Sequence, residues 1–513
     1  MKKFLNKILT RKVITGALIF FQIVWWVLLL FRVSGFFPHI NTICNMIGII
    51  LAIYIINRDN NPSYKLAWIL PIMIFPLFGT LIYLLYSNKR PSRYLRKKFN
   101  ESKNALDDTV GKSELYQDEN VISKMDGYNT SISRYLNRVG YPVYDETQTE
   151  YFKSGEELFP HILEEISKAE RFIFIEYFII QEGKVWNSIL DILAKKAKEG
   201  VDVRVIYDDV GSVSKIPTGY NKKLESMGIK TAVFNPFIPF ISVVMNNRDH
   251  RKILVVDGNT AFTGGINLAD EYMNITHPFG YWKDTAVMMR GKAVWSFTYM
   301  FLHMWNAIND TSNADTDFNK YRPETFDTPK FNVGGFVQPF CDSPLDDESV
   351  SQNVYINMLH SAKKYAYICT PYLVIDDEMK NALTFAAKRG VDVRIITPGI
   401  PDKKFVYRLT RSYYPGLLAS GVKIYEYSPG FVHAKSFVCD DETAMVGTIN
   451  LDFRSLYLHF ECGVLLTGTN TVFSIRDDME SMFNICEEIK KPKKRSFLGK
   501  VFDSILRTFA PLV

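Results

Sequence analysis

Hydrophobic residues are arranged in two different ways along the 513-residue chain. Near the N-terminus they form three long apolar blocks, at residues 13–31, 40–56 and 66–86. Each block approaches the roughly 20 residues that an α-helix needs to cross a bilayer. The pattern therefore predicts an N-terminal α-helical membrane segment of two to three helices over residues 1–87.

The first apolar block has an alternative interpretation, because a basic stretch before an apolar block is also typical of a cleaved signal peptide. No small-x-small cleavage site follows this block, and further apolar blocks come after it. We therefore expect a retained anchor. Pro71 and Pro76 in the third block would kink a helix, which membrane helices tolerate.

The rest of the chain has the alternating helix and strand patterns of an α/β protein. Residues 88–130 are polar and charged and are predicted to form a linker. From about residue 150, apolar positions with helical spacing at 156–169 precede a β-branched and aromatic strand at 171–180. A helix at 185–198 and a strand that begins at Gly200 follow.

The same order of elements recurs later, with a helix at 354–362, a strand at 365–369 and a helix at 378–388. Gly200-Val-Asp-Val-Arg204 matches Gly390-Val-Asp-Val-Arg394 residue for residue. This long period indicates a tandem duplication of an α/β unit. Alternating strands and helices predict a mixed, largely parallel sheet flanked by helices in each copy.

The apolar N-terminal part and the α/β part of the chain differ in net charge. The first 90 residues contain ten Lys or Arg and one acid, Asp59, so the remainder carries a net charge of −3 within a total of +6. The body of the protein is thus nearly neutral, and we expect no nucleic-acid partner. The basic run at 89–98 predicts that the body lies on the cytoplasmic side. Three spans would then put the basic N-terminus outside, so the number of spans stays open.

Cysteine usage agrees with a reducing compartment. No CxxC spacing occurs, so neither a zinc site nor a disulfide framework is indicated. The six cysteines are Cys44, Cys341, Cys369, Cys439, Cys462 and Cys486.

One eight-residue pattern, HxKxxxxD, occurs twice. Its copies are His250-Arg-Lys252-Ile-Leu-Val-Val-Asp257 and His433-Ala-Lys435-Ser-Phe-Val-Cys-Asp440. Each is followed by a small-residue turn that ends in Asn, Gly264-Gly265-Ile266-Asn267 and Gly447-Thr448-Ile449-Asn450. Two full copies predict one phosphate site that is built from two half-sites.

The chemistry of these side chains suits a phosphodiester. Alternate positions of a strand point to one face, so each His and its Lys project into the same cleft. Lysines and Asn amides stabilise charge on non-bridging oxygens, and we therefore expect no metal and no cofactor. Asn267, Asn450 and Gly265 are the predicted phosphate-binding residues. A neutral imidazole can attack phosphorus, and a second one can act as general acid and base.

Each catalytic histidine needs an acid that orients its other ring nitrogen. Asp257 and Asp440 belong to the motif, but on an alternating strand they point away from the histidines. We interpret these two aspartates as structural anchors of the turn. Asp284 and Glu461 occupy matching places before an apolar strand in the two halves, and they are the predicted orienting acids.

The repeated motifs resemble the signature of the phospholipase D superfamily. Within it the chain is most similar to bacterial cardiolipin synthases, through Asn61-Pro62-Ser63, Tyr141-Pro-Val-Tyr144 and Asn450-Leu-Asp-x-Arg454-Ser455. The resemblance implies phosphatidyl transfer between two phosphatidylglycerol molecules, which gives cardiolipin and glycerol. It also implies a phosphohistidine intermediate, with His250 as nucleophile and His433 as acid and base. The catalytic set is thus His250, Lys252, Asp257, His433, Lys435 and Asp440.

These observations predict an α/β protein with two tandem phospholipase D-like lobes, 131–325 and 326–489, behind the membrane segment. A basic amphipathic tail at 490–513 ends the chain, and its helix either lies at a bilayer surface or docks on the catalytic core. The expected location is the cell membrane, with bilayer and phosphatidylglycerol as partners. A phospholipase D hydrolase, or a transferase with another alcohol acceptor, remains the alternative, and the oligomeric state stays open.

Overall fold

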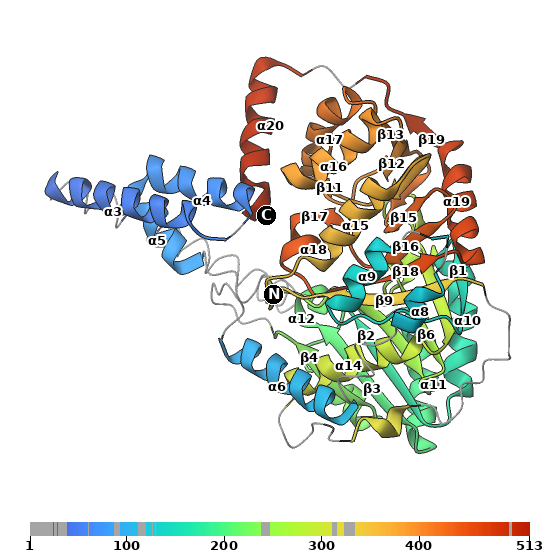
Figure 1. Cartoon of the computed structure of the whole chain (residues 1–513). Coiled ribbons are helices and arrows are strands. Elements are labelled where there is room, and N and C mark those ends of the chain that lie inside the picture. The colour runs from blue at the N-terminus through green and yellow to red at the C-terminus, as the bar shows by residue number, and fades with distance from the viewer. Residues whose placement is uncertain are drawn as a thin grey trace, which may run out of the picture. The chain divides into compact units, whose positions relative to one another are not determined.

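A computed structural model gives the fold of the chain (Figure 1). The chain forms two compact units, one of residues 1–91, 236–246 and 504–513 and one of residues 92–235 and 247–503. The structure describes residues 24, 28, 38–59, 61–86, 93–110, 119–125, 127–128, 130–236, 247–309, 315, 317–322, 334–491 and 495–512.

The first half of the larger unit is built on a seven-stranded sheet with the strand order β1-β8-β6-β5-β2-β3-β4. Strands β2, β3 and β4 are parallel, and the other pairs are antiparallel, so the sheet is mixed as predicted. The expectation of a largely parallel sheet is wrong, because a short connection such as that between β5 and β6 joins antiparallel neighbours. The strands are β1 (Thr147–Phe152), β2 (Phe172–Tyr177), β3 (Asp202–Asp208), β4 (Lys230–Phe234), β5 (Lys252–Val256), β6 (Thr260–Gly264) and β8 (Ala286–Gly291). The helices are α10 (Gly155–Lys168), α11 (Lys184–Lys198), α12 (Asp209–Ser212), α13 (Tyr220–Ser226) and α14 (Val294–Ile308).

The second half repeats this plan around an eight-stranded sheet of order β19-β13-β12-β10-β15-β16-β18-β9. The strands are β9 (Phe336–Asp342), β10 (Tyr365–Cys369), β12 (Asp392–Pro398), β13 (Lys423–Tyr427), β15 (Ser436–Cys439), β16 (Thr443–Gly447), β18 (Glu461–Thr467) and β19 (Cys486–Glu488). The helices are α15 (Val350–Ser361), α16 (Asp377–Lys388), α17 (Lys404–Leu418), α18 (Phe453–Tyr457) and α19 (Asn470–Phe483). The prediction of two α/β lobes with mixed sheets is confirmed.

The duplicated sequence is used in the same way in both lobes. In the first lobe Asp202 pairs with Arg204 at 2.7 Å and with Lys230 at 2.8 Å. In the second lobe Asp392 pairs with Arg394 at 2.6 Å and with Lys423 at 2.8 Å. One acid therefore ties the starts of two neighbouring parallel strands together in each copy.

Part of the segment predicted as a linker is packed on the core. Helix α6 (Arg93–Val110) buries Phe99 and Leu106 in the same hydrophobic cluster as α14. Ser102 Oγ on α6 donates to the carbonyl oxygen of His303 on α14 at 2.9 Å. The prediction of a linker over the whole of 88–130 is therefore wrong, because a few apolar residues on one helical face suffice to dock an otherwise charged helix.

In the described part of the smaller unit lie the apolar helices α3 (Pro38–Ile56), α4 (Pro62–Ile74) and α5 (Pro76–Tyr86). The first predicted span, 13–31, lies almost wholly outside the described residues. The third predicted span is two helices, since Phe75 ends α4 and Pro76 begins α5. In the part of the chain that the structure describes, no helix combines the length and the apolar content required to cross a membrane.

Candidate active site

Both motif histidines lie at the start of a central, buried strand. His250 comes two residues before β5, and His433 comes three residues before β15. Every residue of both strands is buried, as the apolar stretch inside each motif predicts. The strand position fixes the backbone of each His and Lys at the middle of its sheet.

Each histidine is held by an acid from the opposite lobe. His250 Nδ1 lies 2.9 Å from both carboxylate oxygens of Glu461, which begins β18. His433 Nδ1 lies 2.7 Å from Asp284 Oδ2, just before β8. The sequence singled out both acids, but the pairs are crossed between the lobes. Neither half-site is complete without the other lobe.

Backbone hydrogen bonds fix this crossed arrangement. The amide of His250 donates to the carbonyl oxygen of Phe460 at 2.9 Å, and the amide of His433 donates to that of Lys283 at 2.7 Å. Lys283 belongs to β7 (Tyr281–Lys283), which pairs with β14 (Gly430–Val432) across the lobe boundary. In both halves the residue before the acid therefore accepts, through its carbonyl oxygen, the backbone N–H of the histidine from the other lobe.

Burial keeps the histidines neutral. Only 7% of each residue is exposed. Burial, and then the positive charge of the motif lysines, lowers the pKa of His250 well below its usual value and that of His433 to about 4. A neutral imidazole with one ring nitrogen held by a carboxylate leaves its other nitrogen, Nε2, for chemistry.

The two motif lysines are also buried. Lys252 Nζ donates to the carbonyl oxygen of His250 at 2.7 Å, and Lys435 Nζ lies 2.9 Å from His433 Nδ1. Burial lowers the pKa of Lys252 to about 8 and that of Lys435 to about 7. Such ammonium groups gain from an anionic ligand, because it offsets the cost of their desolvation.

The predicted phosphate-binding residues differ from one another. Asn267 uses both ends of its amide within the protein, since Ile179 N donates to its Oδ1 at 3.1 Å and its Nδ2 donates to Tyr272 Oη at 2.8 Å. The side-chain oxygen of Asn450 is buried and has no hydrogen-bond partner among the described residues. The two amides are therefore used differently, since that of Asn267 is bonded within its own lobe at both ends and that of Asn450 is not bonded at its oxygen to any described residue.

Gly265 serves the site in a different way from the predicted one. Its backbone N–H donates to the carbonyl oxygen of Thr285 at 3.0 Å and so is not directed at a ligand. A Cβ at this position would lie 2.0 Å from Asp284 Oδ1. The glycine therefore makes room for the acid that holds His433.

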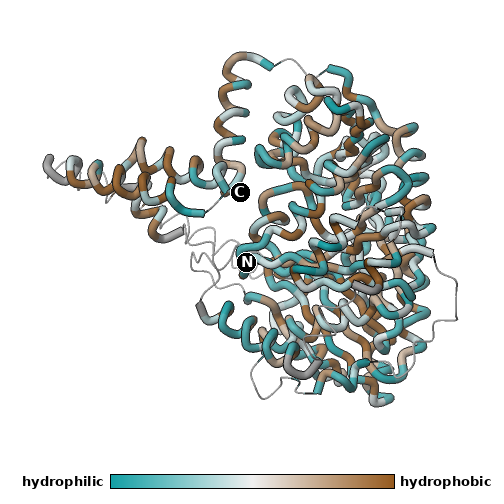
Figure 2. The backbone as a smooth tube through the Cα atoms, viewed as in Figure 1, coloured by the Kyte–Doolittle hydropathy of each residue, from teal (hydrophilic) through white to brown (hydrophobic). Residues whose placement is uncertain are grey.

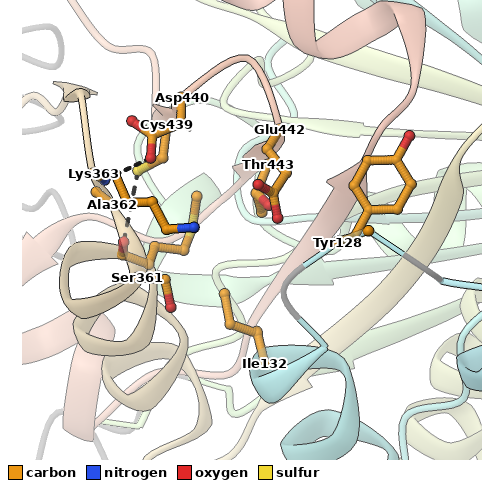
Figure 3. Close-up of a pocket in the computed structure, with 11 residues that line it drawn as sticks. Tyr128, Ile132, Ser361, Ala362, Lys363, Cys439, Asp440, Glu442 and Thr443 are labelled. Atoms are coloured by element: carbon orange, nitrogen blue, oxygen red, sulfur yellow. Dashed lines mark hydrogen bonds between the residues drawn. The ribbon is translucent and has the colours of Figure 1, made fainter.

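The motif aspartates lie at the other end of their strands, away from the histidines. The carboxylate of Asp257 accepts the backbone N–H groups of residues 170, 171 and 172 at 2.8 Å each, just before β2. Asp440 does the same for residues 363, 364 and 365 before β10, and Figure 3 shows it beside Lys363. Both have a positive φ, 53° and 57°. Both carboxylates thus make the turn contacts expected of structural anchors, and their place in the catalytic set stays a prediction.

Family models match most of this architecture. The model described as cardiolipin synthase, PLD-like domain, matches residues 162–296 and 355–483, which contain both motifs. The chain belongs to this family. A second model, described as phospholipase D-nuclease N-terminal, matches residues 47–87.

Relatives of this cardiolipin synthase family align over almost the whole chain. A protein of Streptococcus mutans serotype c is 45% identical over 91% of this chain and 100% of its own length. Proteins named cardiolipin synthase from Alkalihalophilus pseudofirmus and Halalkalibacterium halodurans are 35% and 33% identical, over 91% and 100% of this chain and 92% and 100% of their own. The crystal structure of phosphatidylserine synthase from Haemophilus influenzae shares the fold, with a TM-score of 0.56 and 17% identity over 74% of this chain and 97% of that one.

A third histidine, His459, also lies at the site between the two lobes, although it is not part of the repeated motif. Its ring centroid lies 5.7 Å from that of His250, and its Nδ1 lies 3.8 Å from Glu461 Oε1. Both ring nitrogens are buried, and neither has a hydrogen-bond partner among the residues that the structure describes. Trp282 occupies the matching place beside His433, at 5.5 Å. His459 stands two residues before Glu461, and Trp282 stands two residues before Asp284. The spacing from the predicted acids could therefore have identified both rings.

Among the described residues, one group has the composition of a metal site. The ligating atoms of His250, His459 and Glu461 lie within 4.8 Å of one another. The ammonium groups of Lys252 and Lys435 depress the pKa of His250, which means that they oppose positive charge at this place. The site therefore fits an anion better than a cation.

Proposed function

We propose that the protein transfers a phosphatidyl group from one phosphatidylglycerol to another and so forms cardiolipin and glycerol. The crossed His–acid pairs carry this proposal, because they bring two imidazoles, each held by a carboxylate, and two buried lysines into one site. Family membership gives the substrate class. Relatives of the chain are named cardiolipin synthase, after the product of this reaction.

The first step is nucleophilic attack. His250 Nδ1 is held by Glu461, so Nε2 forms the bond to phosphorus and a phosphohistidine results. The bond between phosphorus and the headgroup glycerol oxygen breaks, and that oxygen takes a proton from Nε2 of His433, which enters this step as the imidazolium beside Asp284 and the anionic phosphodiester and leaves it neutral. The two lysines stabilise the charge on the non-bridging oxygens.

The second step runs in reverse with a different alcohol. His433 accepts the proton of the terminal hydroxyl of a second phosphatidylglycerol, and the oxygen attacks phosphorus. The bond to His250 breaks, and the free enzyme returns. Water in place of the lipid hydroxyl would give phosphatidic acid, so the acceptor decides between transfer and hydrolysis.

We further propose that the protein works at the cell membrane with the two lobes on the cytoplasmic side. Three observations support this location: the match of residues 47–87 to the N-terminal family model, the apolar helices α3 to α5, and the six free cysteines. The basic run that follows α5 agrees with it.

A test uses phosphatidylglycerol that carries deuterium in its headgroup glycerol, with the full chain in vesicles. Release of deuterated glycerol, and its incorporation back into lipid from solution, are expected for reversible transfer through a covalent intermediate. Release without incorporation, together with ¹⁸O from labelled water in phosphatidic acid, would instead make the protein a hydrolase. Loss of both signals in His250→Ala ties them to this site.

A further inference from the structure

Helix α20 (Phe497–Phe509) exposes the side that a helix in water normally hides. Phe497 and Leu498 are 78% and 77% exposed, and Val501 and Phe502 are 42% and 45% exposed. At 100° per residue these four side chains fall within an arc of about 140°. They form one apolar stripe, and Figure 2 shows hydrophobic (brown) segments along this helix.

On the opposite side of α20, Asp503 faces the second lobe. Asp503 is 8% exposed and accepts from Arg408 Nε on α17 at 2.8 Å. Arg495 Nη1 also donates to Asp503, and Arg408 Nη2 donates to the carbonyl oxygen of Gly499 at 3.4 Å. The helix is thus attached to the second lobe by a partly buried charge cluster, and its apolar stripe is left exposed.

The start of α17 continues the same kind of surface. Lys404 lies one helical turn before Arg408 and so on the same face of α17. Lys403 and Lys404 are exposed, as are the apolar side chains of Ile400 at 41% and Phe405 at 43%. Basic and apolar groups together are typical of a surface that lies on an anionic bilayer.

This surface begins close to the catalytic groups. The amide of Ile400 donates to the carbonyl oxygen of Gly430 at 3.3 Å, and Gly430 begins β14, which leads directly into His433. Lys403 lies over the ring of Tyr372 at 5.1 Å, and its charge contributes to the lowered pKa of His250. A bilayer against this surface would therefore lie at the side of the site.

We propose that α20 and the start of α17 form a docking surface for the bilayer, which we call the rim surface. It consists of Ile400, Lys403, Lys404, Phe405, Phe497, Leu498, Val501 and Phe502. Its apolar side chains enter the headgroup region of an anionic bilayer, and its lysines bind lipid phosphates. The rim surface extends the proposed function, since it would hold the catalytic lobes where a lipid headgroup can reach His250 and His433.

Fluorescence tests the docking without any turnover. The full chain with Leu498→Cys, labelled with an environment-sensitive dye, is reconstituted in vesicles of phosphatidylglycerol and phosphatidylcholine that contain a lipid-borne quencher. A blue shift and quenching are expected at position 498, and neither at Lys198→Cys on α11, an exposed control in the first lobe. Labelled protein without either substitution gives the background of the native cysteines.

Kinetics gives a second, independent readout. Leu498→Asp with Val501→Asp is expected to raise the KM for vesicle phosphatidylglycerol about tenfold or more, with a nearly unchanged kcat. Lys198→Asp, which alters the net charge equally, leaves KM unchanged. Position 498 behaving like position 198 in the quenching experiment would overturn the rim surface. A signal that depends on protein concentration and not on quencher lipid would also overturn the rim surface. It would mean that a second copy of the chain, and not the bilayer, covers the stripe. Quenching in a protein that makes no cardiolipin would refute only the proposed reaction.

Discussion

Gly265 shows how one missing side chain shapes the site. A methyl group there would lie 2.0 Å from Asp284 Oδ1, far inside van der Waals contact. Asp284 would have to move, and with it the carboxylate that holds His433 Nδ1. Gly265→Ala is therefore expected to lower kcat about 10²-fold or more in a phosphatidylglycerol transfer assay, with a folded protein.

The control for this variant is Gly416→Ala on α17, where the added Cβ meets nothing closer than 3.9 Å. Its kcat should equal that of the unchanged protein. Equal activity of the two variants would mean that Asp284 does not need its present position.

The motif aspartates should affect stability and not chemistry. Asp257 accepts three backbone N–H groups, and its loss leaves a turn with weaker acceptors. Asp257→Asn is expected to lower the free energy of unfolding by about 1–3 kcal/mol. The kcat per folded molecule should stay close to normal, measured beside the exposed control Asp191→Asn. A loss of kcat as large as that of His250→Ala would mean that Asp257 takes part in the reaction.

The sequence alone predicts part of the site at this scale. The two-residue period of a strand places each His beside its Lys, and it directs Asp257 and Asp440 away from the histidines. The same period says nothing about which lobe supplies the acid. The sequence also does not predict His459, because its place at the site depends on a contact with Glu461 that local sequence does not encode.

At the scale of elements, the crossed acids are the feature to test. Glu461 at the start of β18 and Asp284 before β8 each hold the histidine of the other lobe. Glu461→Gln and Asp284→Asn keep the shape of the side chain but lose its charge, so each imidazole loses its orientation and the support of its cationic form. A fall of about 10²–10⁴-fold in kcat is expected for each.

The double variant gives the control for this prediction. If both acids serve one reaction, Glu461→Gln with Asp284→Asn should cost much less than the product of the single losses. Fully multiplicative losses would indicate that the two half-sites act independently.

The duplicated elements could be predicted because each copy keeps its own local pairs, such as Asp202 with Lys230 and Asp392 with Lys423. Helix α6 could not be predicted, because its docking depends on Phe99 and Leu106 within a mostly charged segment. Tertiary packing decides such a helix, because only a few apolar residues mark its buried face.

At the scale of the whole molecule, the two lobes together bury two ammonium groups, and this sets a pH dependence. The pKa values of Lys435 and Lys252 are lowered to about 7 and about 8, so both lose positive charge as the pH rises through this range. An anionic phosphodiester needs that charge. The value of kcat/KM should therefore fall as the pH rises above about 7.

Bound lipid restores the charge, because a phosphate beside an ammonium group raises its pKa. At saturating phosphatidylglycerol the fall in kcat should therefore begin at a higher pH than the fall in kcat/KM. Initial rates between pH 6 and pH 10 at low and high lipid measure both limbs. A kcat/KM that rises across this range would contradict the role of the lysines.

The most direct test of the central claim is product analysis. The full chain is incubated with phosphatidylglycerol vesicles in the presence of a chelator and without any nucleotide, and the lipids are analysed by mass spectrometry. Cardiolipin and free glycerol in equal amounts are expected, and neither should form with His250→Ala or His433→Ala. Phosphatidic acid as the sole product, or cardiolipin formation that survives both substitutions, would contradict a phosphatidyl transfer carried out by the two crossed histidine–acid pairs.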